Sequence, residues 1–170
     1  MNLFDLNDEV EGLLLIPLWL TPSDQKELCT EIDELEWSSD LGRRTQHYGY
    51  RFDYRTGQVD RLAFDENWFD RVPDQCIVNE YLTDDVHSQG ISAHRDHLRD
   101  FGPVVVTLSL IESWSMRFSR DGYQPVEFLL ETGSIAVLTG DARFEWNHAI
   151  PPRKFDRNGG VRIPRRRRVS

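Results

Sequence analysis

The stretch ISAHRDHLRD, residues 91–100, places two histidines and a carboxylate within four positions of one another. In an extended strand, residues two apart project to the same side, so His94 and Asp96 lie together while Arg95 and His97 point away. One imidazole and one carboxylate on the same side can supply part of a metal ion's coordination sphere. Such a pair alone is more often a surface hydrogen bond, so a third ligand must decide between the two interpretations.

The third ligand must come from a distant segment of the chain. Among the five histidines, His148 stands in FEWNHAIPP, where a later strand of a jelly roll can return beside an earlier one. Two imidazoles and one carboxylate on one face of an octahedral ion form the facial triad of non-haem Fe(II) oxygenases. His94, Asp96 and His148 are therefore candidate catalytic iron ligands.

Polar side chains on the preceding strand suit a small dicarboxylate. In CIVNEYL, residues 76–82, alternation places Asn79 and Tyr81 on one face, where an amide and a phenol can bind carboxylate oxygens. A guanidinium pairs with a carboxylate through two parallel hydrogen bonds, and RRRRVS, residues 165–170, offers four of them. Strand alternation turns either the even-numbered or the odd-numbered pair of these arginines inward and does not choose between them.

The element that opens the chain's regular structure is a helix. TPSD, beginning at Thr21, supplies an N-cap, a proline at the first helical position and an acid at the third. Leu28, Ile32 and Leu35 recur at helical spacing and predict the face that packs on the rest of the protein.

The period of the pattern changes from helical to alternating at about residue 46. Short β-type runs follow, separated by turn signals, in the order CIVNEY, PVVVTLSLI, WSMRFS, VEFLL, SIAVL and RFEWNHAI. Many short strands after a helical start predict a β-sandwich or barrel with a helical support layer. At 170 residues the chain is expected to form one domain with a substantial core.

Charge is distributed unevenly along the chain, whose formal net charge is −9. Residues 1–150 carry a net −16 and residues 151–170 a net +7. The basic end is typical of either a nucleic-acid contact or a solvated surface. The acidic body disfavours tight nonspecific binding to DNA, because phosphate contacts supply most of that affinity. Cys29 and Cys76 are expected to be free thiols. The sequence shows no signal peptide and no membrane span, so we expect a cytoplasmic protein with no membrane partner. We also expect a monomer.

Several motifs in order resemble the AlkB family of Fe(II)/2-oxoglutarate dioxygenases, most closely the branch with the eukaryotic tRNA wobble-uridine hydroxylase. They are NEY, HRD, NHAI and a shortened RVS, with supporting similarity in RRTQHYGYRFDY, VVVTLSL, TGDAR and PPRKFD. The resemblance implies a double-stranded β-helix, or jelly roll, that uses Fe(II), 2-oxoglutarate and O2. It implies iron ligands at His94, Asp96 and His148, and it implies 2-oxoglutarate contacts at the residues Asn79, Tyr81, Arg168 and Ser170.

By the same resemblance, residues 1–42 are a helical support, residues 43–74 a substrate lid and residues 75–170 the catalytic core. The implied substrate contacts are Arg44, His47, Tyr48, Tyr50 and Arg143. For the lid an ordinary packed strand, and for Arg143 a structural ion pair, remain alternatives. The family's final L-T-F-R is missing after Ser170, so either the final strand is cut short or cosubstrate binding is impaired.

The resemblance implies oxidative removal of N-methyl groups from bases of DNA or RNA, with loss of formaldehyde. A base within a duplex would have to be flipped out of the stack. Two alternatives remain: a tRNA or protein hydroxylase on the same scaffold, and a catalytically weak nucleic-acid-binding jelly roll.

Overall fold

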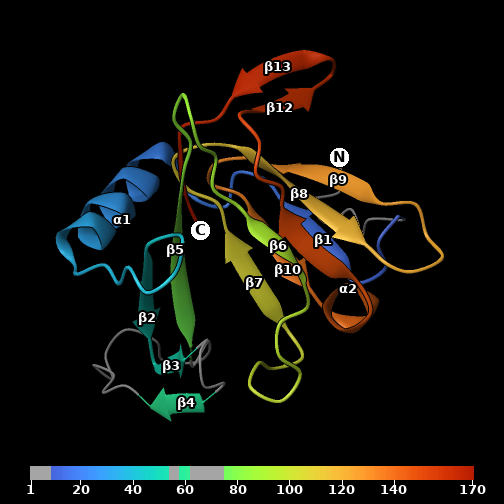
Figure 1. The fold of residues 1–170 in the computed structure, drawn as a ribbon, viewed down its shortest axis with the longest axis horizontal. Helices are drawn as coiled ribbons and strands as arrows, with labels where there is room; N and C mark the ends of the chain where they lie inside the picture. The colour runs from blue at the N-terminus through green and yellow to red at the C-terminus, as the bar shows by residue number, and fades with distance from the viewer. Residues whose placement is uncertain (1–8, 54–57, 62–74) are drawn as a thin grey trace.

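The computed structural model describes residues 9–53, 58–61 and 75–170. Within these residues no helix is both long and apolar enough to cross a membrane. The structure is built mainly from short antiparallel strands arranged as two facing sheets, with one longer helix at the side (Figure 1). This confirms the predicted jelly roll. Cys29 and Cys76 are free thiols.

The larger sheet has two groups of three strands. One group pairs in the order β1 (Leu13–Ile16), β10 (Ile135–Leu138) and β7 (Val105–Leu108). The other pairs in the order β14 (Arg167–Val169), β5 (Cys76–Leu82) and β2 (Thr45–Tyr48). A bridge between Leu110 and Val169 joins the two groups. Strands from both ends of the sequence therefore meet in this sheet.

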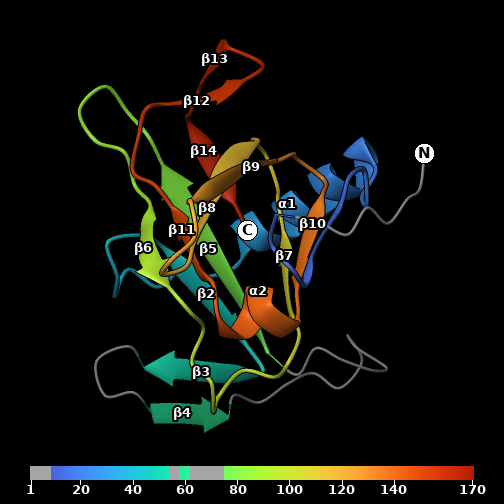
Figure 2. The same ribbon diagram turned by 90° about the vertical axis from the view of Figure 1, so that its right-hand side faces the viewer.

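The smaller sheet carries His94 and His148. Its order is β6 (Ile91–His94), β11 (Asn147–Ile150), β8 (Trp114–Ser119) and β9 (Val126–Leu130). Two hairpins extend from opposite ends of the body, as both views show (Figures 1 and 2). They are β3 (Tyr50–Asp53) with β4 (Gln58–Arg61), and β12 (Phe155–Asn158) with β13 (Val161–Pro164).

The main core fills the space between the sheets. It includes Trp114, Phe118, Leu130, Leu138 and Ile150, all fully buried. In β8 the side chains of Trp114, Met116 and Phe118 turn inward and that of Arg117 outward, as a strand with one buried face requires. This packing fixes the smaller sheet, and with it the orientation of the histidine side chains.

The helix α1 (Pro22–Glu34) begins as predicted. Thr21 and Asp24 form a reciprocal capping box, with Pro22 in the first turn. Ile32 packs on a second core cluster, but Leu35 is 48% exposed. The prediction for Leu35 was wrong because the helix ends one residue earlier and Leu35 has an extended conformation.

Three other features differ from the sequence analysis. The segment before the helix contributes β1, so the N-terminal part is not only a helical support. The run RFEWNHAI is not one strand, since residues 143 and 144 belong to the short helix α2 (Gly140–Phe144). The alternating run after residue 46 is interrupted at Gly49, whose φ of +82° separates β2 from β3. Tyr54, in the same run, lies outside the described residues.

Candidate metal centre and cosubstrate pocket

His94, Asp96 and His148 come together between β6 and β11. His94 is the last residue of β6 and lies directly opposite His148 in the strand pairing. The two imidazole rings are 4.5 Å apart between centroids. Asp96 has one carboxylate oxygen 3.8 Å from His94 Nε2 and the other 3.7 Å from His148 Nε2. One ligand atom from each residue lies within 4.8 Å of the others, as the donors around a single ion do.

The ring nitrogens present the atoms that a metal ion needs. Nδ1 of His94 lies 2.8 Å from the Ser92 carbonyl oxygen, so in the tautomer that donates this hydrogen bond Nε2 keeps its lone pair for a metal ion. Burial lowers the pKa of His148 to about 4, which leaves its imidazole neutral near pH 7. Neutral imidazoles and a carboxylate are the donor set of the facial triad, so these residues fit Fe(II).

The charged neighbours of the ligands contact other groups, although these residues follow the end of β6 and so do not owe their directions to a strand. Arg95 donates a hydrogen bond to the Phe144 carbonyl at 2.7 Å. His97 pairs with Asp100 one turn further along the chain. The charged residues of ISAHRDHLRD thus divide between the ligand cluster and neighbouring contacts.

Arg143 holds the loop that carries Asp96. Its side chain is buried, and its guanidinium donates hydrogen bonds to four carbonyl oxygens of that loop, at distances of 3.0 to 3.3 Å. Those carbonyls belong to Asp96, His97, Phe101 and Gly102. We therefore reassign Arg143 from substrate contact to positioning of Asp96. The alternative of a structural ion pair is also replaced, because the partners are carbonyls rather than a carboxylate.

Arg168 lies on β14 directly opposite Tyr81 of β5. It is fully buried, and among the described residues its only hydrogen bond runs from Nη2 to Ser109 Oγ at 2.9 Å. Its Nε and Nη1 have no partner. Burial lowers the pKa of Arg168 to about 10, so the guanidinium stays charged at neutral pH. A buried charge with two unpaired donors is costly unless a ligand binds it, and a carboxylate is the matching acceptor.

The other arginines of RRRRVS have different surroundings. Arg165 is buried and bound to Asp156, whereas Arg167 pairs with Asp33 and Glu80. Arg166 is exposed. The structure thus resolves the ambiguity left by strand alternation, because Arg168 alone among the four has unpaired buried nitrogens.

Asn79 and Tyr81 lie beside Arg168, together with a residue that the sequence analysis did not assign. Arg43 donates to Asn79 Oδ1 at 2.7 Å, and its guanidinium lies 5.9 Å from the centre of the Tyr81 ring. The Tyr81 hydroxyl also contacts Ser170 and Arg43, while burial raises its pKa. Ser109, through its bond to Arg168, is a second unassigned member. Neither had a sequence signal, since both depend on which strands pair.

The remaining predicted substrate residues lie just before β2, within β2 and at the start of β3. Arg44 is bound to Glu80 through two hydrogen bonds, and its substrate contact stays a prediction. Tyr48 donates to Gln46 Oε1 and packs against the second core cluster. His47 lies in β2 and Tyr50 begins β3, and their substrate contacts stay predictions.

A jelly roll with this triad and this buried arginine defines a class of iron oxygenase. Residues 56–170 match the 2OG-Fe(II) oxygenase superfamily, and the chain belongs to it. It is an AlkB-like member and a dioxygenase that uses Fe(II), 2-oxoglutarate and O2, as the relatives below support.

An uncharacterized protein of Acanthamoeba polyphaga mimivirus is 31% identical, over 95% of this chain and 83% of its own length. The mouse tRNA (carboxymethyluridine(34)-5-O)-methyltransferase ALKBH8 is 28% identical over 85% of this chain. This chain spans only 25% of that longer protein. The solved structure of OsALKBH1 superimposes with a TM-score of 0.70 over 93% of this chain and 94% of that one. At 15% identity, that likeness concerns the fold.

Proposed function

We propose that this protein oxidises an N-methyl group on a base of DNA or RNA, so that the methyl group leaves as formaldehyde. The observation that carries the proposal is the combination of the His-Asp-His cluster with the unpaired guanidinium of Arg168 in one jelly roll. The first fits Fe(II) and the second fits a carboxylate of 2-oxoglutarate. The nucleic-acid substrate is supported by the AlkB-like family and by the mouse relative, whose name specifies tRNA.

The protein's part in the reaction is to bind and orient. His94, Asp96 and His148 would hold the iron, which supplies O2 activation when bound. Arg168 would pair with one carboxylate of 2-oxoglutarate, and Tyr81 and Asn79 lie beside it to orient the chain of the cosubstrate. The His94 side chain is 35% exposed and that of His148 12%, so the cluster is approached from the His94 side.

The proposed reaction has the stoichiometry of the superfamily, in which the two atoms of O2 go to two different products. One oxygen atom converts the methyl C–H to C–OH, and the other joins 2-oxoglutarate as it loses CO2 and becomes succinate. The hydroxymethyl group on nitrogen then breaks its C–N bond and leaves as formaldehyde, returning a proton to the base nitrogen.

Mass spectrometry of products tests the proposal directly. Methylated single-stranded DNA, RNA and tRNA are incubated with protein, Fe(II), 2-oxoglutarate and O2. We expect loss of the mass of one CH2 group, together with formaldehyde and succinate. The Asp96→Ala variant is the matched control, because it removes one metal ligand and leaves the cosubstrate pocket intact.

A different product would point to the second candidate. Gain of one oxygen atom by tRNA, without loss of CH2, would identify a tRNA hydroxylase; the name of the mouse relative specifies tRNA as that protein's substrate. Succinate formation that no nucleic acid stimulates would contradict both and leave a protein hydroxylase.

A further inference from the structure

The β12–β13 hairpin projects from the body at the end opposite to β3–β4, as both views show (Figures 1 and 2). It follows closely after β11, which carries His148. Its strands pair with Phe155 opposite Pro164 and Arg157 opposite Arg162. Directly opposed residues share a face, so Phe155, Arg157 and Arg162 lie on one side of the hairpin and Asp156 on the other.

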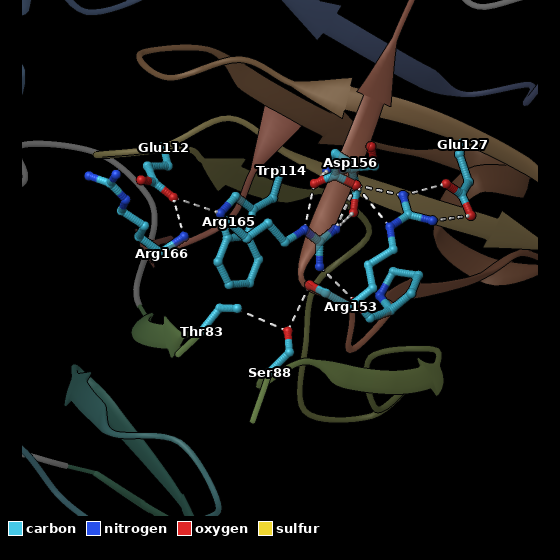
Figure 3. Close-up of polar contacts among 11 residues, drawn as sticks. Thr83, Ser88, Glu112, Trp114, Glu127, Arg153, Asp156, Arg165 and Arg166 are labelled. Atoms are coloured by element: carbon cyan, nitrogen blue, oxygen red, sulfur yellow. Dashed lines mark hydrogen bonds and ion pairs between the residues drawn. The ribbon is translucent and has the colours of Figure 1, made fainter. Parts of the chain in front are cut away.

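The Asp156 side is anchored to the body (Figure 3). Asp156 is fully buried and accepts hydrogen bonds from Arg165 Nε at 2.5 Å and Nη2 at 2.8 Å. Arg153 Nη2 donates to the same carboxylate at 2.6 Å, and the Ser115 amide donates at 3.1 Å. The Arg165 guanidinium also lies 4.4 Å from the centre of the Trp114 ring. The hairpin is therefore fixed to the core at its base.

The opposite side of the hairpin, which we call the outer face, carries Phe155, Arg157 and Arg162, all exposed. The Arg162 guanidinium stacks on the Phe155 ring at 3.9 Å. Neither Arg157 nor Arg162 forms an ion pair or hydrogen bond from its side chain in the described structure. The outer face thus presents two free guanidinium groups and an aromatic ring.

The placement of these two arginines opposes folding. Like charges directly opposite each other in an antiparallel pair are destabilising. The chain has 29 acidic residues against 20 basic ones, yet none of those in the described part of the chain pairs with either guanidinium. An external anion would remove the repulsion.

We propose that the outer face binds the phosphate backbone of a nucleic acid as a second contact, remote from the metal centre. This inference rests on the proposed function, because it assigns a docking surface for the same substrate. Guanidinium groups match phosphate through paired hydrogen bonds. The Phe155 ring with its stacked Arg162 is the kind of platform on which unpaired bases stack. Since residues 1–150 are net negative, the attraction for a polyanion is concentrated here.

The proposal predicts a dependence on substrate length. Gly159 in the hairpin turn follows His148 by eleven positions, so the two lie at most about 40 Å apart. A strand of about 20 nucleotides is long enough to span even this maximum separation. The proposal predicts that a stacked trinucleotide, which covers only on the order of 10 Å, occupies the metal centre without contacting the outer face.

The test compares the double variant Arg157→Gln/Arg162→Gln with a control of equal net charge, Lys26→Gln/Arg117→Gln. The control residues are exposed and lie on α1 and β8, outside the hairpin. The probe is a fluorescein-labelled single-stranded RNA of about 20 nucleotides, titrated at several salt concentrations. For the hairpin variant we expect binding weaker by on the order of tenfold and a salt slope smaller by roughly 1.4. The control should bind as the wild type does.

A second variant separates binding from folding. Arg157→Glu replaces the like-charge pair by an opposite-charge pair, so the melting temperature should stay equal or rise while RNA affinity falls. A methylated 20-nucleotide strand should be turned over with lower kcat/KM by both hairpin variants, and a methylated trinucleotide at an unchanged rate.

Equal affinities and equal salt slopes in hairpin and control variants would overturn the inference. So would polyglutamate competing as well as unlabelled RNA, because the surface would then select any polyanion. If no methylated base is oxidised at any length, the proposed function fails, but the binding measurement still decides the role of the hairpin.

Discussion

Arg165 and Arg168 are both buried and stand three residues apart, but their surroundings are opposites. Every guanidinium nitrogen of Arg165 has a partner: Asp156 accepts two hydrogen bonds, and the Pro151 and Ser115 carbonyls accept one each. Within the described part of the chain, Arg168 has one hydrogen bond, to Ser109, and two nitrogens beside Tyr81 without a partner. One guanidinium is satisfied by the protein, and the other is not.

The difference separates structure from function. When both partners of a buried ion pair belong to the chain, removing either one destabilises the fold, because the other charge is left buried and unpaired. A buried charge without a partner in the protein is tolerated where a ligand supplies that partner. The unpaired guanidinium of Arg168 therefore marks the predicted 2-oxoglutarate site. We therefore expect changes near Arg168 and the metal centre to affect turnover, and changes near Arg165 to affect stability.

The largest expected effect is at the metal centre. Asp96→Ala removes the one carboxylate of the triad, so succinate formation should fall by more than about 100-fold, beyond the loss typical of outer-sphere partners. The melting temperature should not fall, because Asp96 is not part of the hydrophobic core. Succinate is measured by mass spectrometry and unfolding by circular dichroism. Wild-type turnover in this variant would refute the triad.

In the buried ion pair of Arg165, Asp156→Asn should lower the free energy of unfolding by about 3–5 kcal/mol, because Arg165 is left buried without its counter-charge. Urea denaturation measures the loss. The apolar double variant Asp156→Leu/Arg165→Met should recover much of it. Folded Asp156→Asn protein should keep the wild-type KM for 2-oxoglutarate, and a raised KM would show that the two regions are not separate.

Arg143 has features of both the Arg165 ion pair and the metal site. It is buried like Arg165, but it holds the loop that carries a metal ligand. Arg143→Lys keeps the charge and loses the fork that reaches four carbonyls. Metal affinity should fall by roughly 10- to 100-fold, as for other residues that orient ligands. Titration with Mn(II) measures this, and an unchanged affinity would reduce Arg143 to a purely structural role.

The smallest expected effect is the response to acid. Burial alone would raise the pKa of Asp156, but hydrogen bonds from Arg165 and Arg153 lower it below the usual 3.8. Its stabilising contribution is therefore present above that value and lost as the pH falls through the lowered pKa. Below about pH 4 the stability difference between wild type and Asp156→Asn should shrink, as urea denaturation at stepwise lower pH would show. A constant difference would contradict the assignment.

Local rules predicted the parts of the site that depend on neighbouring residues. Alternation along a strand separated His94 and Asp96 from Arg95, and a motif far along the chain supplied His148. The N-cap at Thr21 and the strand runs were predicted in the same way, because capping and alternation act over a few residues.

What could not be predicted depends on which strands pair. Arg44 meets Glu80 and Arg43 meets Asn79 only because β2 lies beside β5. Strand alternation did not choose among the four arginines; the family resemblance pointed to Arg168, and the position of Arg168 opposite Tyr81 became visible only with the pairing of β14 and β5. Arg143 binds carbonyls, which leave no mark in a sequence. The role of β1 was missed because LLLI fits a buried strand or a helix turn equally well.

The most direct test is equilibrium binding of 2-oxoglutarate, measured by calorimetry without oxygen and with Mn(II) in place of Fe(II). Wild type is compared with Arg168→Met and with Arg166→Gln, the exposed neighbour in the same arginine run. Arg168→Met should bind 2-oxoglutarate at least about 30-fold more weakly, the equivalent of 2 kcal/mol for an unpaired buried partner. Arg166→Gln should stay within about twofold, as surface changes do. Equal affinity of Arg168→Met and wild type would contradict the assignment of the cosubstrate site.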